Sequence, residues 1–189
     1  MLFKIIDKIK YKLLHSQIKP EIIGYDIAEN TGVSNMTHIS NKKNVFIGKN
    51  VFIGHFNYID GYRKIVIEEG CQITNHVSIV SHSSHNTIRL QYLNTKKTLE
   101  GLESGEVYIG KNTYVGANSV IMPGTKIGKG CIVSAFSFVK GDFPDYSILR
   151  GQPAKVIGST KDIDAIFLDK NPEYLEYYYD KEFNSEDTK

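Results

Sequence analysis

The chain has few cysteines and lacks the hydrophobic segments of secreted and membrane proteins. Tryptophan is absent, and Cys71 and Cys131 are the only cysteines among 189 residues. Two cysteines are too few for a disulfide framework. The sequence also has no apolar run of membrane-spanning length and no signal-like core followed by a small-residue cleavage site. We therefore expect a globular protein located in the cytoplasm.

An excess of charge of one sign is also missing. The chain has 23 Lys and Arg against 21 Asp and Glu, which gives a formal net charge of +2. So small an excess does not attract a whole surface to nucleic acid, and no nucleic-acid partner is expected. Hydrophobic residues make up 41% and charged residues 23%, which is typical of an ordinary folded domain.

What the sequence does contain is an aliphatic residue at every sixth position. The clearest run is Ile109, Val115, Ile121, Ile127, Val133 and Val139. An upstream run is Ile47, Ile53, Ile59 and Ile65, which continues after a two-residue shift as Ile67, Ile73 and Ile79. A weaker run precedes them at Ile27, Val33, Ile39 and Val45. Such a period indicates an internal repeat, which decides the architecture.

The six-residue period predicts short flat segments joined by corners. A helical period of 3.6 residues would not keep every sixth residue on one face. A β-branched residue at this spacing can instead point into a shared core, which stacked coils bury. Glycine often follows it and is expected to relieve the corner, as at Gly48, Gly54, Gly110, Gly116 and Gly128. Both cysteines fall at or near the small fifth position and are predicted to be buried, reduced thiols.

Residues 109–139, IGKNTYVGANSVIMPGTKIGKGCIVSAFSFV, resemble the hexapeptide-repeat acyltransferases. Residues 150–158, RGQPAKVIG, resemble the closing motif of that family, usually GNPAK, with Gln152 in place of the common Asn. The resemblance implies an all-β fold, a left-handed parallel β-helix over residues 21–158, and a homotrimer. It also implies an acetyltransferase that uses acetyl-CoA as co-substrate and requires no metal.

The six-residue period stops after Ile79 and resumes at about Val107, leaving an excursion loop over residues 81–106. A long excursion from a regular solenoid is usually functional or disordered. His82 and His85 stand at its start, where the sugar and xenobiotic O-acetyltransferases that this chain resembles carry their catalytic histidine. A neutral imidazole can remove the proton of an acceptor hydroxyl as that hydroxyl attacks the thioester directly. His82 is the preferred base because it is still attached to the rigid coil, and His85 is the second choice. The alternative that both are surface histidines stays open.

The resemblance also implies that CoA lies in a groove between adjacent β-helices. Its pantetheine arm would contact small residues of the later coils, and basic residues would lie near its phosphates. The predicted donor residues are Tyr114, Gly116, Ala117, Ser134, Ala135, Lys140, Arg150 and Lys155. The alternatives are that the repeat itself demands the small residues and that the basic residues form a solvated rim. Asn57, Tyr58 and Asp60 come one coil before His82 and are expected to line the acceptor mouth.

Both ends of the chain are predicted to be helical. In residues 1–20, apolar residues and lysines alternate at helical spacing, which predicts a basic amphipathic helix. This helix either caps the open end of the β-helix or lies on a membrane surface. Residues 159–189 predict a helix, a break near Pro172 and a second helix.

The function favoured by the sequence is O-acetylation of a sugar or surface-polysaccharide hydroxyl. N-acetylation of an amino-sugar nucleotide and acetylation of an antibiotic are close alternatives. Outside this class, a zinc-dependent gamma-type carbonic anhydrase would need convergent ligands, for which His76, His82 and His85 are candidates. A structural β-helix without catalysis would need neither the loop histidines nor the basic residues.

Overall fold

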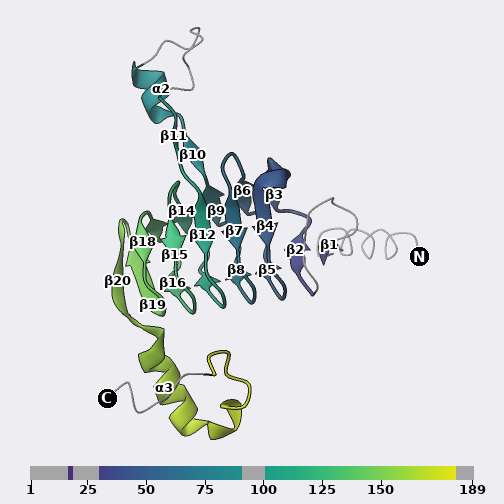
Figure 1. The fold of residues 1–189 in the computed structure, drawn as a ribbon, viewed down its shortest axis with the longest axis vertical. Coiled ribbons are helices and arrows are strands. Elements are labelled where there is room, and N and C mark those ends of the chain that lie inside the picture. Colours follow the sequence, from purple (N-terminus) through teal and green to yellow (C-terminus); the bar gives the residue numbers. More distant parts are fainter. Residues whose placement is uncertain (1–16, 19–29, 91–100, 182–189) are drawn as a thin grey trace, which may run out of the picture.

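The computed structural model describes residues 17–18, 30–90 and 101–181. Its strands stack into coils around one axis, and three sheets of mainly parallel strands enclose a single core (Figure 1). Sheet A contains β1 (Gln17–Ile18), β2 (Gly32–Ser34), β5 (Phe52–Ile53), β8 (Gln72–Ile73), β13 (Tyr114–Val115), β16 (Ile132–Val133), β19 (Ser147–Gly151) and β20 (Ala154–Ser159). Sheet B contains β4 (Val45–Ile47), β7 (Ile65–Ile67), β12 (Val107–Ile109), β15 (Lys126–Ile127) and β18 (Asp142–Phe143). Sheet C contains β3 (His38–Ser40), β6 (Tyr58–Asp60), β9 (Ser78–Val80), β14 (Val120–Ile121) and β17 (Phe138–Val139).

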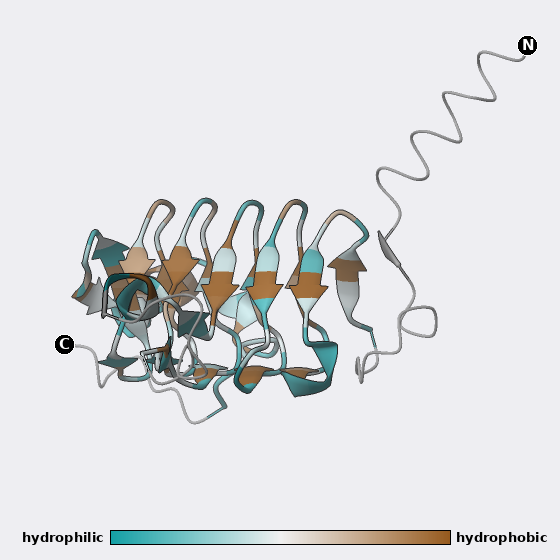
Figure 2. Cartoon of the chain, turned by 90° about the horizontal axis from the view of Figure 1, so that it is seen from above, coloured by the Kyte–Doolittle hydropathy of each residue, from teal (hydrophilic) through white to brown (hydrophobic). Residues whose placement is uncertain are grey.

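The six-residue ladder forms the core. Its described members, from Val33 to Val139, are all at most 4% exposed, and Cys71 and Cys131 are 1% exposed. Apolar residues recur at matching positions of successive strands (Figure 2). Repeated burial of this kind is the main stabilising contribution in a stacked solenoid. The all-β, left-handed parallel β-helix predicted from the sequence is confirmed.

The coils are not all of the same length. Paired residues lie 20 apart in the early coils, as with Ile53 and Ile73. The spacing falls to 18 between Val115 and Val133 and to 16 between Val133 and Leu149. The two additional residues of the early coils lie at the corner where the chain passes from sheet C to sheet B. We call this the C–B corner (residues 41–44, 61–64, 81–106, 122–125 and 140–141). This extension explains the two-residue shift of the aliphatic period.

The role expected for the glycines that follow the aliphatic residues is wrong. Gly48 and Gly110 do not have positive φ; a Cβ on them would meet backbone atoms of the next coil at 2.6 Å. They are therefore needed for close stacking of coil on coil. The left-handed conformations fall elsewhere, mainly on asparagines such as Asn50 and Asn112, which tolerate positive φ better than most residues.

The excursion forms an arm with its own secondary structure. β10 (His82–Ser83) pairs antiparallel with β11 (Glu103–Ser104), and α2 (His85–Leu90) follows β10. The arm projects away from the coils (Figure 1). Despite the insertion, Ile65 pairs directly with Val107 in sheet B. The solenoid therefore continues across the excursion without a change of register.

The C-terminal segment differs from its prediction. α3 (Thr160–Lys170) begins at Ser159, whose side chain accepts a hydrogen bond from the Lys161 N–H at 3.2 Å. The second helix expected after Pro172 is a single 3₁₀ turn, η3 (Pro172–Tyr174). Of the helix predicted for residues 1–20, the structure describes only Gln17 and Ile18. These form β1, which pairs antiparallel with β2, so the helical prediction is wrong at these two residues. No helix in the described part of the chain is long and apolar enough to cross a membrane.

Candidate active site

The site is centred on His82, the first residue of the arm. Its Nδ1 is hydrogen-bonded to Oδ2 of Asp60, the last residue of β6 in the preceding coil. The Asp60 side chain is only 3% exposed, whereas that of His82 is 34% exposed. A carboxylate can only accept a hydrogen bond, so the bond requires a proton on Nδ1 and leaves the lone pair of neutral His82 on Nε2.

Several contacts fix this pair. The second carboxylate oxygen of Asp60 accepts a hydrogen bond from Ser40 Oγ at 2.9 Å. Ser81 Oγ donates to the Asp60 carbonyl oxygen at 2.6 Å and accepts from the Arg63 N–H at 2.8 Å. The Tyr62 ring packs against the His82 ring with 4.6 Å between centroids. The imidazole is therefore oriented by a buried carboxylate and by an aromatic neighbour.

The residues predicted to line the acceptor mouth are placed differently from one another. Asn57 is buried, donating from its amide to the carbonyl oxygens of Gly54 and Thr74 and accepting from the Val77 N–H, so it holds a corner together. Asp60 is buried against His82. Both side chains are therefore buried within the coils. Tyr58 is exposed and stacks on His38 of the preceding coil.

His85 lies in a different environment from His82. Its Nδ1 is 2.8 Å from Ser83 Oγ, and its Nε2 is 3.5 Å from Glu103 Oε2. Both ring nitrogens therefore have partners within the arm, and its side chain is 49% exposed. Unlike His82, it is not attached to a coil strand by a buried group. This geometry favours His82 over His85 as a proton acceptor.

Lys140 joins the arm to the coils. Its ammonium group donates a hydrogen bond to Glu103 of β11 at 2.5 Å. The Lys140 hydrogen bond holds the pKa of the Glu103 carboxyl below its usual value, assisted by the charges of Lys140 and His85. Lys140 is thus paired with a carboxylate of the arm. It lies apart from the other residues predicted to bind CoA.

The other residues predicted to bind CoA, the acetyl donor, form a strip along the corner between sheets A and C. The Ala117 carbonyl oxygen accepts a hydrogen bond from the N–H of Phe136, which follows Ala135. The Ser134 N–H donates to the carbonyl oxygen of Leu149, which precedes Arg150. Arg150 is paired with Lys155 across the β19–β20 ladder. The donor strip consists of Gly116, Ala117, Ser134, Ala135, Arg150 and Lys155. Gly116 also has a packing role, since a Cβ there would lie 2.5 Å from the Ala135 nitrogen. Tyr114 is exposed on the adjoining face of sheet A.

Comparison with known proteins agrees with the fold and the repeat. The family model described as bacterial transferase hexapeptide (six repeats) matches residues 106–141. This stretch of the chain therefore resembles the hexapeptide-repeat transferases.

Two curated relatives match parts of this hexapeptide-repeat chain. The putative lipopolysaccharide biosynthesis O-acetyl transferase WbbJ of Escherichia coli is 32% identical over 104 residues, 53% of each protein. The chloramphenicol acetyltransferase of Agrobacterium fabrum is 36% identical over 67 residues, which is 35% of this chain and 32% of the relative. The matches span about half or less of these relatives' lengths.

Two solved structures share the hexapeptide-repeat fold. Galactoside acetyltransferase in complex with coenzyme A superposes with a TM-score of 0.64 at 22% identity, covering 84% of this chain and 80% of the other. AntD, an N-acyltransferase from Bacillus cereus in complex with dTDP and 3-hydroxybutyryl-CoA, gives a TM-score of 0.62 at 21% identity, covering 83% and 98%.

The histidines considered for zinc do not meet within one chain. His76 lies at the corner between sheets A and C, stacked on Phe56 with 5.1 Å between ring centroids, whereas His82 and His85 belong to the arm. Among the described residues there is no group of three His, Cys, Asp or Glu side chains that could hold a metal ion.

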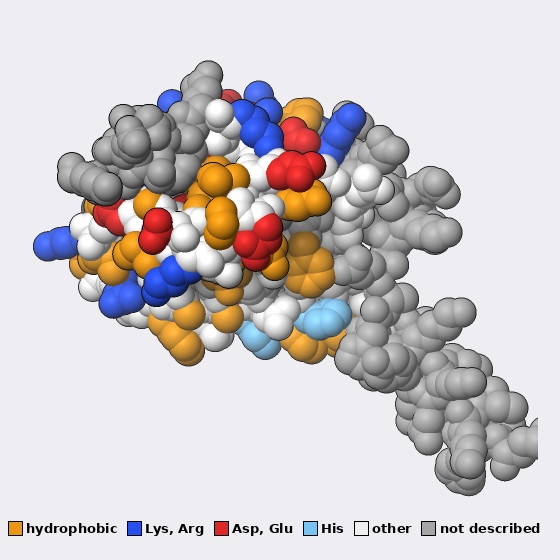
Figure 3. All heavy atoms as spheres, turned by 90° about the horizontal axis from the view of Figure 1, so that it is seen from below, with side chains coloured by type: hydrophobic (Ala, Val, Ile, Leu, Met, Phe, Trp, Pro, Cys, Tyr) orange, Lys and Arg blue, Asp and Glu red, His pale blue; other side chains and the backbone are white. Residues whose placement is uncertain are grey.

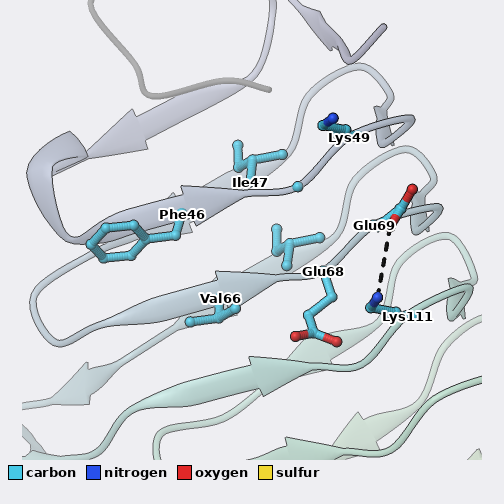
Figure 4. A pocket seen from close by; sticks show the side chains of 9 residues that line it. Phe46, Ile47, Lys49, Val66, Glu68, Glu69 and Lys111 are labelled. Atoms are coloured by element: carbon cyan, nitrogen blue, oxygen red, sulfur yellow. Dashed lines mark ion pairs between the residues drawn. The ribbon is translucent and has the colours of Figure 1, made fainter. Parts of the chain in front are cut away.

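A shallow groove of about 420 Å³ lies elsewhere, over sheet B and the corner that follows it. Phe46 and Val66 line its apolar part, and Lys111 is 3.7 Å from Glu69 at its polar edge (Figure 4). Neither His82 nor the donor strip contributes to it. On the face drawn in Figure 3, basic and acidic side chains are interspersed with apolar ones, so that face does not carry charge of one sign.

The sequence interpretation missed three residues of this site: Asp60 as the partner of His82, and Tyr62 and Arg63 beside it. Counting one coil of 20 residues back from His82 gives Tyr62, because strand pairs such as Asp60 and Val80 keep that spacing. The two-residue shift of the aliphatic period was the available signal. It marks the extended corner that holds these side chains.

Proposed function

We propose that this chain is an acetyl-CoA-dependent O-acetyltransferase that modifies a hydroxyl of a sugar or surface polysaccharide, with His82 as general base. The observation that carries the proposal is the hydrogen bond between buried Asp60 and partly exposed His82 at the base of the arm. The names of the relatives, an O-acetyl transferase of lipopolysaccharide biosynthesis and a galactoside acetyltransferase, support a sugar acceptor. The cytoplasmic location expected from the sequence stays a prediction.

The proposed reaction is direct transfer. His82 Nε2 accepts the proton of the acceptor hydroxyl as its oxygen forms a bond to the thioester carbonyl carbon. Asp60 holds the ring in the required tautomer and stabilises the imidazolium that forms. The tetrahedral intermediate then collapses, the C–S bond breaks, and the imidazolium returns its proton to the departing CoA sulfur. The products are the acetyl ester and CoA, and neutral His82 is regenerated.

The donor strip would hold CoA. Gly116, Ala117, Ser134 and Ala135 leave room for a narrow pantetheine arm, while Arg150 and Lys155 supply positive charge for its phosphates. The strip lies at the corner between sheets A and C, whereas His82 lies at the C–B corner. A site that uses both therefore brings together two chains.

The homotrimer is part of this proposal. Phe56, Phe136 and Phe138 are exposed along sheet C and its corner with sheet A, and Phe136 is 63% exposed. Large exposed aromatic side chains grouped on one edge indicate a surface that is covered in the assembled protein. In a closed trimer, that edge and the donor strip of one chain would face the arm of the next.

N-acetylation is the second candidate, favoured by the structural likeness to AntD in complex with dTDP and 3-hydroxybutyryl-CoA. The same base would serve an amine acceptor, so only the acceptor panel separates the two reactions. Acetylation of an antibiotic, suggested by the chloramphenicol acetyltransferase relative, is separated by the same panel.

The test is thiol release from acetyl-CoA over sugars, amino-sugar nucleotides and chloramphenicol. We expect release with a sugar, and we expect His82→Ala to lower kcat by about 100- to 10,000-fold, the usual range for a general base. His85→Ala is the matched control in the same arm and should retain most of the activity. Equal loss in both variants would contradict the assignment of the base. Absence of both turnover and CoA binding would contradict the acyltransferase function, and bound zinc would then support the carbonic anhydrase alternative.

A further inference from the structure

Two side chains next to His82 take no part in the proton transfer described above. Tyr62 and Arg63 lie in the C–B corner of the preceding coil, within the two-residue extension of the repeat. We propose that they form an acceptor subsite for a sugar that carries an anionic group, a carboxylate or a phosphate. This assignment rests on the proposed function, because it takes His82 as the base that acts on the bound sugar.

Their position beside the base is the first argument. The Tyr62 ring centroid lies 4.6 Å from that of His82, and the two rings are tilted by 35°. The guanidinium carbon of Arg63 lies 5.5 Å from the Tyr62 ring centroid. Tyr62 is partly exposed and Arg63 is exposed. A ligand that contacts either side chain is therefore held close to the imidazole.

The hydrogen-bonding capacity of Arg63 is the second argument. Its Nε donates to Ser104 Oγ of the arm at 3.1 Å, which fixes the plane of the guanidinium group. Within the part of the chain that the structure describes, its two Nη groups have no hydrogen-bond or ion-pair partner. A guanidinium group held in this way can bind both oxygens of a carboxylate or phosphate.

The neighbouring charges are the third argument. Glu103, the acidic residue of β11, already pairs with Lys140 and His85. Asp60 is buried against Ser40 and His82. Among the described residues no carboxylate is paired with Arg63, so its charge is available to a ligand. Tyr62 supplies an aromatic face on which the apolar side of a sugar ring can pack.

The experiment compares three acceptors that share one ring: methyl galactoside, methyl galacturonate and galactose 6-phosphate. We expect the wild-type protein to prefer at least one of the two anionic sugars in kcat/KM. Arg63→Gln should lower the anionic-to-neutral ratio of kcat/KM by about 10- to 100-fold, as loss of a charge-assisted bond does. Arg63→Lys keeps the positive charge but cannot donate two parallel hydrogen bonds, so it should restore part of that ratio. Binding of the same sugars, followed by ligand-observed NMR, gives a second readout that needs no turnover.

Two controls separate recognition from structural support. Lys64→Gln removes the next positive charge, which lies over the Phe46 ring on sheet B, and should leave the ratio unchanged. Ser104→Ala removes the strut between Arg63 and the arm but keeps the charge, so the preference for an anionic sugar should persist.

Each remaining outcome is decisive. A wild-type protein that acetylates the neutral sugar as well as the anionic ones, with a ratio unaffected by Arg63→Gln, would overturn the subsite and leave the proposed function standing. Equal effects of Ser104→Ala and Arg63→Gln on the ratio would show that Arg63 is only a strut. If none of the sugars binds or is acetylated, the subsite is overturned together with the sugar acceptor.

Discussion

Asp60 shows how the setting of one residue decides its role. Its side chain is buried, yet both carboxylate oxygens have partners, Ser40 and His82. A buried carboxylate is costly unless it is hydrogen-bonded or paired. Here the two hydrogen bonds offset that cost, and one of them orients the residue proposed as the base.

Replacing Asp60 by Asn should therefore affect catalysis more than binding. The amide can still contact His82, but it no longer stabilises the imidazolium or enforces the tautomer with Nε2 unprotonated. We expect kcat to fall by about 100-fold or more with little change in the affinity for CoA, measured by calorimetry. Ser40→Ala, which removes the other partner of the same carboxylate, is the control and should cost much less activity. An unchanged kcat in Asp60→Asn would remove Asp60 from the mechanism.

The two cysteines are predicted to be unreactive in the folded protein. Burial raises the pKa of the Cys71 thiol to about 12, and burial also raises that of Cys131. At pH 8 both thiols stay protonated, and the thiolate is the reactive form. A thiol reagent should therefore label neither residue in native protein and both after unfolding. Rapid labelling of the native protein would show that the coils open around these residues.

At the scale of elements, polar contacts attach the arm to the coils. The Lys140–Glu103 pair joins the end of β17 to β11, and Arg63 bonds Ser104. The Glu103 pKa is lowered in the folded protein, so its contribution is present above the ordinary carboxyl pKa and is lost as the pH falls through the lowered value. Because both side chains are at least partly exposed, this contribution is small.

Lys140→Met should loosen the arm without unfolding the coils. We expect faster amide hydrogen exchange in residues 82–90 and 101–106, with the exchange of sheet C residues unchanged. Lowering the pH through the depressed pKa of Glu103 should have the same effect on the wild-type arm, since the carboxylate is then protonated. Lys126→Met, at an exposed lysine of sheet B, is the control. Identical exchange in both variants would show that the ion pair does not hold the arm.

The C-terminal element shows where local sequence signals fail. Residues after Pro172 have the composition of a helix, but Tyr178 donates to Asp164 of α3 at 2.6 Å, and Tyr146 of the coils is bonded to Asp180. These tertiary contacts draw the chain back over α3 and the coils, so only a 3₁₀ turn forms. The local sequence pattern does not encode such tertiary contacts, and they override the helix propensity of these residues.

At the scale of the whole molecule, the proposed site is divided between two chains. We predict that His82→Ala and a double variant, Arg150→Gln with Lys155→Gln, are each weakly active alone but recover activity when unfolded and refolded together. Mixed trimers would contain some interfaces with an intact donor strip and an intact base. Recovery is measured by thiol release, and a solution mass checks the trimer. No recovery in confirmed mixed trimers would place both halves of the site within one chain.

The sequence predicted the fold better than the site because the two depend on different information. The aliphatic ladder is a local period, and it indicated the stacked coils and their buried core directly. The Asp60–His82 contact instead depends on how many residues each coil contains, since the partners are 22 residues apart. Because every corner was assumed to have the same length, Asp60 was predicted to line the acceptor mouth. Tyr62 and Arg63 were not identified.

The unbroken pairing of Ile65 with Val107 across the excursion makes the C–B corner a place where chain can be added or removed without disturbing the core. In different coils this corner is a two-residue turn, a four-residue turn or an entire arm. Acceptor preference can therefore diverge among descendants of one scaffold while its hydrophobic interior stays under constant selection. The same corner is a natural junction for grafting a foreign loop.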